Sequence, residues 1–111
     1  MPRRARRESA TGFYHIVSRG LDRENIFGEK REKTRFLNLL KDNLNECNVE
    51  IYAYCVMSNH FHLLVKVEKE IMPIFMAKVL GRYAKYYNYK HNRIGYVFEN
   101  RYNTQCIEDE R

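Results

Sequence analysis

Two apolar segments near the middle of the chain are separated by only two residues, a spacing that strongly limits how the chain can fold. Residues 49–57 and 60–67 are rich in β-branched, aromatic and aliphatic side chains, and the turn-forming pair Ser58-Asn59 lies between them. Because so short a connection returns a strand beside the one before it, the spacing predicts an antiparallel β-hairpin.

The second of these segments carries two histidines, His60 and His62, on either side of Phe61. Side chains alternate faces along a strand, so both histidines point to one face while Phe61 points into the core. Two imidazoles on one sheet face form part of a divalent metal site with further coordination positions open. The alternative is the polar face of an edge strand that carries two histidines without any ligand.

The flanking segments complete a recognisable order of elements. Residues 12–19 and 96–107 have strand-like composition, and residues 29–48 and 71–88 have apolar residues at helical spacing. With the hairpin, the order β-α-β-β-α-β predicts an α+β, ferredoxin-like fold, an antiparallel sheet with both helices on one face. Its first and third strands are central, which places the histidines mid-sheet on the open face. Gly81, inside the second helix, is expected to permit close packing.

Composition limits the remaining possibilities. At 111 residues the chain forms a single domain, and its net charge of +6 favours an anionic partner. Four of the arginines lie in the first seven residues, so residues 1–9 are expected to form a flexible basic arm. Three widely spaced cysteines indicate free thiols in a reducing, cytoplasmic environment, and no segment is apolar enough to cross a membrane.

Four segments, in order, carry a family resemblance: YHIVSRG at 14–20, AYCVMSNHFHLL at 53–64, LGRYAKYYN at 80–88 and VFENRY at 97–102. On these motifs the chain resembles the HUH single-strand DNA transposases with one catalytic tyrosine, an insertion-sequence family that includes the REP-associated tyrosine transposases. The resemblance implies Mg²⁺ or Mn²⁺ held by His60 and His62 against the scissile phosphate. It also implies DNA cleavage and strand transfer through a 5′-phosphotyrosine intermediate.

Other residues are expected to take part by their position or by the same resemblance. His15, on the neighbouring strand, is expected to be a third metal ligand or a partner of the histidine pair, or simply a hydrogen-bonded sheet residue. DNA contacts are expected at Arg19 and Arg101, which match the family's pattern. Arg82 and Lys85 lie on a basic helical face that either contacts phosphate or is simply solvated. Tyr54 shares one face of its strand with Tyr52, and both are expected to stack unpaired bases if that face is the open one. The implied partners are single-stranded DNA carrying a hairpin and a second copy of the chain, since relatives act as homodimers.

The nucleophile is the point at which the chain departs from the family. In relatives the tyrosine lies on a helix after the last strand, and this sequence stops at residues 107–111, where that helix is expected to begin. We therefore expect a fragment or decayed copy that binds DNA and metal without cleaving by itself. Tyr83 and Tyr87 are expected in the core. The alternative function is a non-catalytic module that binds single-stranded nucleic acid on the same sheet, although the signature of RNA-recognition domains is missing.

Overall fold

The computed structural model describes residues 8–107 of the chain. In chain order the elements are β1 (Phe13–Arg19), a 3-10 turn (Leu21–Arg23), α1 (Lys30–Cys47), β2 (Glu50–Val56), β3 (His60–Lys66), α2 (Met72–Lys90) and β4 (Asn103–Ile107). This is the predicted order, with small shifts at most element ends. The last segment differs most, because residues 91–102 form a loop and only the final five residues pair as a strand.

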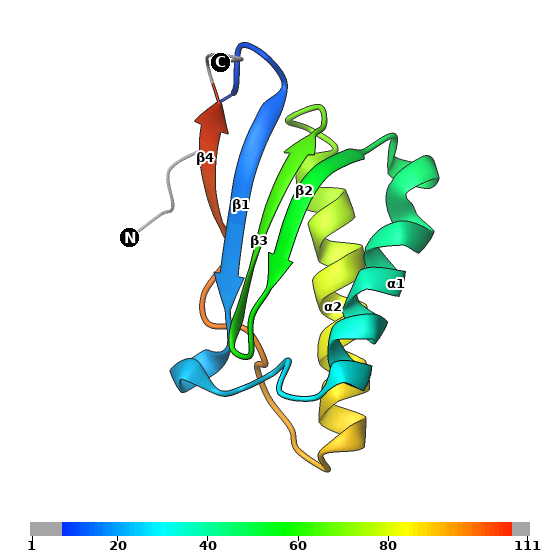
Figure 1. The fold of residues 1–111 in the computed structure, drawn as a ribbon, viewed down its shortest axis with the longest axis vertical. Coiled ribbons are helices and arrows are strands. Elements are labelled where there is room, and N and C mark those ends of the chain that lie inside the picture. Colours follow the sequence, from blue (N-terminus) through cyan, green and yellow to red (C-terminus); the bar gives the residue numbers. More distant parts are fainter. Residues whose placement is uncertain (1–7, 108–111) are drawn as a thin grey trace.

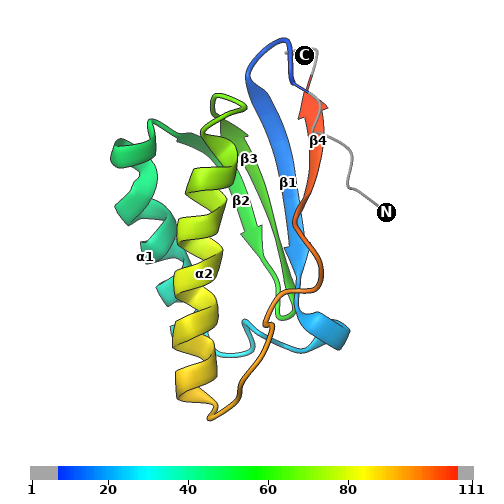
Figure 2. The same cartoon turned by 180° about the vertical axis from the view of Figure 1, so that it is seen from behind.

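The strands form one antiparallel sheet in the order β2-β3-β1-β4, so β1 and β3 are the central pair, as predicted. Val17 of β1 pairs with His62 of β3, and Arg19 pairs with His60. Both long helices lie against the same face of the sheet (Figure 1), and the view from behind shows them side by side to the left of the strands (Figure 2). The structure therefore confirms the expected α+β, ferredoxin-like architecture.

The core lies between the sheet and the two helices, and Phe61 occupies its centre near the hairpin turn. Ring centroids of Phe61 and Phe36 are 4.7 Å apart, and those of Phe61 and Phe27 are 6.2 Å apart. Phe61 is fully buried. Because close-packed side chains hold their backbone in place, this aromatic cluster fixes the part of β3 from which the two histidines project.

The hairpin turn is also attached to the end of β1. The backbone N–H of Gly20 donates to the carbonyl of Asn59 at 2.8 Å, and that of Phe27 donates to the carbonyl of Ser58 at 2.8 Å. A side chain at position 20 would collide with the backbone carbonyl of Glu24, so glycine permits this close approach. The turn and the first residues of β3 are therefore held from two sides.

A buried carboxylate joins the start of α1 to the end of α2. Glu32 is almost fully buried, and it accepts hydrogen bonds from the backbone N–H of Glu29 at 3.0 Å, from His91 Nε2 at 2.6 Å and from Lys90 Nζ at 3.2 Å. Burial by itself would raise the pKa of Glu32, but these hydrogen bonds outweigh it and lower the pKa. The contact gives His91 a structural role in addition to its favourable position at a helix C-terminus.

One irregularity in β2 changes which side chains share a face. The pairing between β2 and β3 shifts at Tyr52, which is the extra residue of a β-bulge. Beyond the bulge Tyr54 pairs with the buried Leu63, so Tyr54 lies on the helix side of the sheet, whereas the Tyr52 ring packs against a ring of β1 on the open face. The expectation that Tyr52 and Tyr54 share one face is therefore wrong, because one inserted residue reverses the alternation.

A second correction concerns Gly81. This residue is exposed on α2, and nothing lies within 4 Å of the place where its Cβ would stand. Gly81 therefore does not serve close packing against the sheet.

Two further expectations concern membrane-spanning segments and disulfides in residues 8–107. None of their helices is long and apolar enough to span a lipid bilayer, and no disulfide joins their three cysteines. Most of the expected basic arm, residues 1–7, lies outside the described residues.

Candidate functional site

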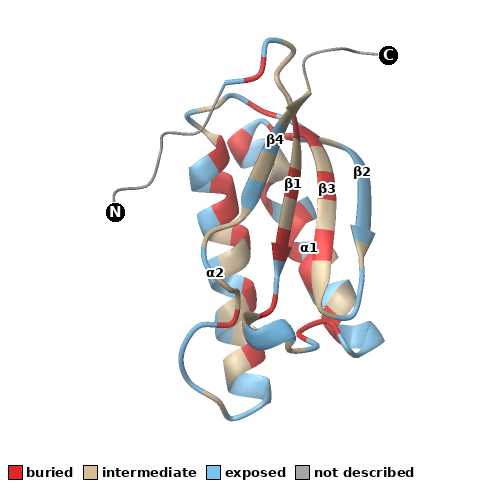
Figure 3. Cartoon of the chain, turned by 90° about the vertical axis from the view of Figure 1, so that its left-hand side faces the viewer, coloured by how far each residue is buried: buried red, intermediate tan, exposed pale blue. Residues whose placement is uncertain are grey.

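His60 and His62 project onto the sheet face that no element of residues 8–107 covers, which is the face seen in Figure 3. Their ring centroids are 5.1 Å apart and their planes are nearly perpendicular, at 79°. The pair is central across the width of the sheet, as expected. Along the strand it lies at the first residues of β3, next to the hairpin turn, and not midway along the sheet.

Asn59 determines which nitrogen of His60 is available to a ligand. Its side-chain Oδ1 lies 2.8 Å from Nδ1 of His60. Because an amide oxygen only accepts hydrogen bonds, Nδ1 of His60 carries a proton, and Nε2 is the nitrogen left for a ligand. The sequence indicates only a turn-forming role for Asn59, although an amide directly before a candidate ligand was a signal for this contact.

His15 makes the corresponding contact with His62. Nε2 of His15 lies 3.0 Å from Nδ1 of His62, and the two rings are almost parallel, at 7°. Their centroids are 5.2 Å apart, which is what a 3.0 Å contact between nitrogens requires when the rings lie end to end in one plane. One nitrogen therefore donates directly along the lone pair of the other, as in a well-formed hydrogen bond.

This geometry bears on the three roles expected for His15. Two nitrogens that bind one metal ion direct their lone pairs at a common third point, whereas these two nitrogens point at each other. The contact therefore makes His15 a hydrogen-bond partner of His62. Among residues 8–107, no three His, Cys, Asp or Glu side chains form a cluster arranged to hold a metal ion.

The environment of His62 favours its neutral form. Burial is the main cause that lowers the pKa of His62, and the neighbouring rings of His15 and His60 lower it further. A neutral imidazole is the form that binds metals, since the ligand is the nitrogen lone pair. His62 therefore offers a nitrogen donor in its neutral form, next to His60 on the open sheet face.

Two of the arginines expected to contact DNA lie near this end of the sheet. Arg19 pairs with His60 across the strands, and its guanidinium forms an ion pair with Glu99 at 3.2 Å. The backbone N–H of Glu99 also donates to the carbonyl of Arg19 at 3.0 Å, which holds the loop of residues 91–102 against the end of β1. Arg101 is half-buried, two residues further along the same loop.

The other expected contacts lie on the far side of the molecule. Arg82 and Lys85 are on the exposed surface of α2, in the helical layer, and Tyr54 lies on the helix side of β2. Arg19 and Arg101 therefore lie near the histidines, and the other three expected DNA-contacting residues lie on the helix side of the sheet. The sequence could not predict this division, because it does not show which side of a helix or of a bulged strand faces a ligand.

Two tyrosines in the core are unsuited to act as nucleophiles. The Tyr83 hydroxyl donates to the backbone carbonyl of Ile26, and the Tyr87 hydroxyl donates to Glu24 Oε2 at 2.7 Å. Burial is the main cause that raises the pKa of both hydroxyls, which makes their ionised form harder to reach. Both side chains are core residues, as expected from the apolar stripe of the second helix.

Comparisons with known proteins are consistent with these features. The model of the family described as "Transposase IS200 like" matches residues 9–110. A transposase-designated crystal structure from Deinococcus radiodurans R1 superposes with a TM-score of 0.68 at 16% identity, over 98% of this chain and 86% of that one. A REP-associated tyrosine transposase bound to a REP hairpin also gives 0.68, at 11% identity over 98% of this chain.

The fold and the paired histidines define a ferredoxin-like domain of the tyrosine transposase class. The match over nearly the whole chain makes the assignment specific, and the chain belongs to the IS200-like transposase family. It spans 64% of the length of the hairpin-bound REP-associated transposase. No curated protein has a significantly similar sequence.

Proposed function

We propose that this domain binds a divalent cation and single-stranded DNA in the cleavage and strand-transfer reactions of transposition. The observation that carries this proposal is that Nδ1 of both His60 and His62 is engaged in a hydrogen bond within the protein. Asn59 accepts from His60, and His15 is bonded to His62. When His62 is the donor to His15, both histidines present Nε2 lone pairs on the same open face.

The donor set suits Mn²⁺ and accommodates Mg²⁺ only with help from other ligands. Imidazole binds transition metals well, whereas Mg²⁺ prefers oxygen ligands and keeps several waters. In this proposal His60 and His62 hold the ion, and water and DNA phosphate oxygens complete its shell. The bound cation supplies electrostatic stabilisation of charge that develops on the scissile phosphate.

The chemistry that follows from family membership is tyrosine attack on phosphorus. The tyrosine hydroxyl loses its proton as its oxygen bonds to the phosphorus, the bond from phosphorus to the 3′ oxygen breaks, and that oxygen takes up a proton to become a free 3′-OH. The DNA is left with a 5′-phosphotyrosine link, and the reverse reaction rejoins strands. We do not assign the nucleophile to Tyr83 or Tyr87, since both hydroxyls are buried and already bonded.

The proposed DNA is a single strand that carries a hairpin. An open sheet face accepts unpaired bases, as in other sheet-based nucleic-acid binders. The REP-associated transposase of the same fold is bound to a REP hairpin. Arg19 and Arg101, at the same end of the sheet, are the proposed phosphate contacts. A homodimer, as the family resemblance implies, is also proposed, and light scattering of the purified chain tests it.

The metal site is tested by titrating Mn²⁺ and following the loss of its free-ion electron paramagnetic resonance signal. We expect measurable binding that disappears in H60A and in H62A. H91Q is the matched control, because it changes a histidine remote from the site and keeps a donor to Glu32. Unchanged Mn²⁺ binding in both alanine variants would rule out this site.

DNA binding is tested by its salt dependence with a hairpin oligonucleotide that has a single-stranded tail. For single strands the slope of log K against log salt is about −0.7 for each neutralised phosphate. We expect a clear negative slope that becomes shallower in R19Q. Affinity that does not respond to salt contradicts the proposal. Salt-dependent binding without any metal requirement favours the non-catalytic binding module.

A further inference from the structure

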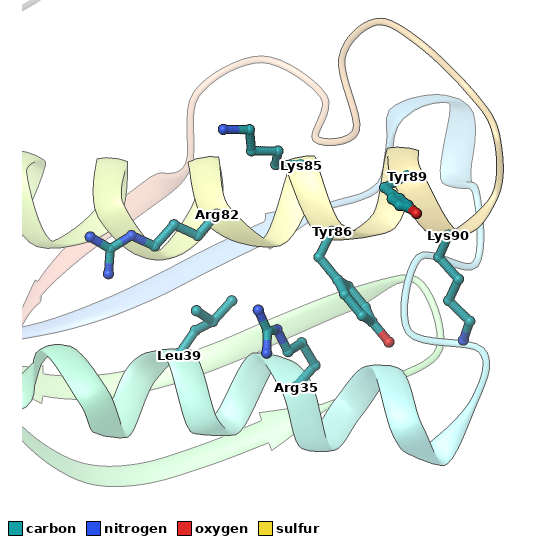
Figure 4. A pocket seen from close by; sticks show the side chains of 7 residues that line it. All are labelled: Arg35, Leu39, Arg82, Lys85, Tyr86, Tyr89 and Lys90. Carbon is teal, nitrogen blue, oxygen red and sulfur yellow. The ribbon is translucent and has the colours of Figure 1, made fainter.

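A groove between α1 and α2 opens on the outer side of the helical layer, away from the histidines. Its volume is about 730 Å³, and its lining includes Arg35 and Leu39 of α1 and Arg82, Lys85, Tyr86 and Tyr89 of α2. Figure 4 shows Arg35 and Leu39 pointing across the groove toward Arg82 and Tyr86. The groove therefore brings cationic and aromatic side chains from two helices together.

Four cations line this groove, and one of them, Lys90, is paired with Glu29 and Glu32. The other three, Arg35, Arg82 and Lys85, form no ion pair with any carboxylate of residues 8–107, although the charge of Arg82 helps to lower the pKa of Glu46. Positive charges without a close counter-ion around one concave surface repel one another, and an anion bound between them relieves that repulsion.

Tyr86 provides an independent indication of a ligand. Its hydroxyl oxygen is buried and has no hydrogen-bond partner among the described residues. A buried hydroxyl without a partner is unfavourable, and native structures rarely leave one unexplained. The guanidinium of Arg35 lies 5.2 Å from the centroid of the Tyr86 ring, so the unpaired hydroxyl and an uncompensated cation share one wall of the groove.

We propose that this groove binds the phosphate backbone of a second segment of the DNA substrate. Phosphate oxygens would accept hydrogen bonds from Arg35 and Arg82, and from the buried Tyr86 hydroxyl once a side-chain shift on binding opens it to the groove. The exposed ring of Tyr89 offers a surface on which a base stacks. The inference rests on the proposed function, since it assumes a DNA substrate. It adds a site on the face opposite the histidines, so that one domain holds two parts of the same molecule.

The test removes two groove charges in a background that lacks the histidine site. In H60A/H62A protein, R82Q/K85Q is compared with K33Q/K41Q, which removes the same charge from another side of α1. The probes are a DNA hairpin and a non-self-complementary strand of equal length. For two lost phosphate contacts we expect the salt slope to become shallower by about 1.4 for single strands or 1.8 for duplex.

The two probes identify which DNA segment occupies the groove. A larger effect on the hairpin assigns the groove to the duplex stem, and a larger effect on the linear strand assigns it to single-stranded DNA. An R82Q/K85Q effect no larger than that of K33Q/K41Q overturns the inference and leaves the proposed function intact. Absence of DNA binding by the unmodified chain overturns both. If the groove charges are needed for binding polyglutamate but not for binding DNA, the inference is overturned, and the ligand of the groove is an acidic protein.

Y86F gives a second readout that a purely structural role would not produce. Because it removes an unpaired buried hydroxyl, we expect the free protein to melt at the same or a higher temperature. DNA affinity should nevertheless fall about tenfold, as expected for loss of one hydrogen bond to a charged group. Unchanged DNA affinity in Y86F removes Tyr86 from the site and contradicts the proposed contacts.

Discussion

The contact between His15 and His62 gives a quantitative prediction about metal binding. H15F keeps an aromatic ring of similar size at this position and removes both nitrogens, so Nδ1 of His62 loses the partner that now lies 3.0 Å away. H15Q keeps a hydrogen-bond acceptor on a side chain of similar reach. If His15 acts by orienting His62, the two substitutions have different effects, although both remove the imidazole.

The expected size of the effect follows from the geometry. A neutral hydrogen bond contributes about 1 kcal/mol net, which is roughly a fivefold change in an equilibrium constant. Loss of the hydrogen-bonded partner of a metal-binding histidine usually lowers metal affinity about 10- to 100-fold. Since the His15 contact is well aligned and partly buried, we expect H15F to weaken Mn²⁺ binding about tenfold, at the lower end of that range. H15Q should stay within about threefold of the original affinity.

Calorimetric titration measures the affinities, and ¹⁵N spectra of the imidazole groups report the protonated nitrogen directly. Without metal, His62 should show a protonated Nδ1 in the original protein and a mixture of tautomers in H15F. Equal Mn²⁺ affinity in H15F and the original protein would refute the orienting role. A direct metal-induced shift at a His15 nitrogen with diamagnetic Zn²⁺ would also refute it, because His15 would then be a ligand.

Three further predictions concern the scaffold and the second histidine contact. N59L should weaken Mn²⁺ binding about tenfold while N59D, which keeps the acceptor, should not; calorimetric titration separates them. E32A should lower the free energy of unfolding by about 3 kcal/mol in urea, since three donors lose a buried partner. The pKa of Glu32 is lower in the folded protein than its ordinary value of 4.5, so the ionised carboxylate contributes its full stabilisation above pH 4.5. That stabilisation is lost as the pH falls through the lowered pKa, so E32Q should make the free energy of unfolding less dependent on pH in the acid range. G20A should destabilise the protein by about 2 kcal/mol through a clash at the hairpin turn, whereas G81A should stabilise it by up to about 1 kcal/mol in the same assay.

The sequence predicts the fold well because its local signals agree with one another. A two-residue turn determines how β2 and β3 pair, and alternation then determines which side of β3 carries the histidines. Phe61 is as buried as expected, and so are Tyr83 and Tyr87 on the second helix. These assignments depend on residues that are close in sequence, where periodicity is informative.

The sequence predicts poorly wherever the outcome depends on a single inserted residue or on contacts between distant residues. Nothing in the composition of β2 marks Tyr52 as a bulge, so the side on which Tyr54 lies could not be read from alternation. The contact between His15 and His62 joins two strands and depends on their register. The unpaired Tyr86 hydroxyl is a property of packing between two helices, which helical periodicity does not describe.

The charges around the histidines suggest that metal and DNA bind interdependently. The proposed ligands, His60 and His62, bring no negative charge, and the nearby carboxylate of Glu99 is already paired with Arg19 at 3.2 Å. A divalent cation at this position therefore keeps most of its charge until an anion joins it, and a DNA phosphate is the proposed anion. By thermodynamic linkage, DNA must then raise Mn²⁺ affinity by the same factor by which Mn²⁺ raises DNA affinity. Mn²⁺ titrations with and without a single-stranded oligonucleotide measure that factor, and a value of one means that the phosphate does not contact the ion.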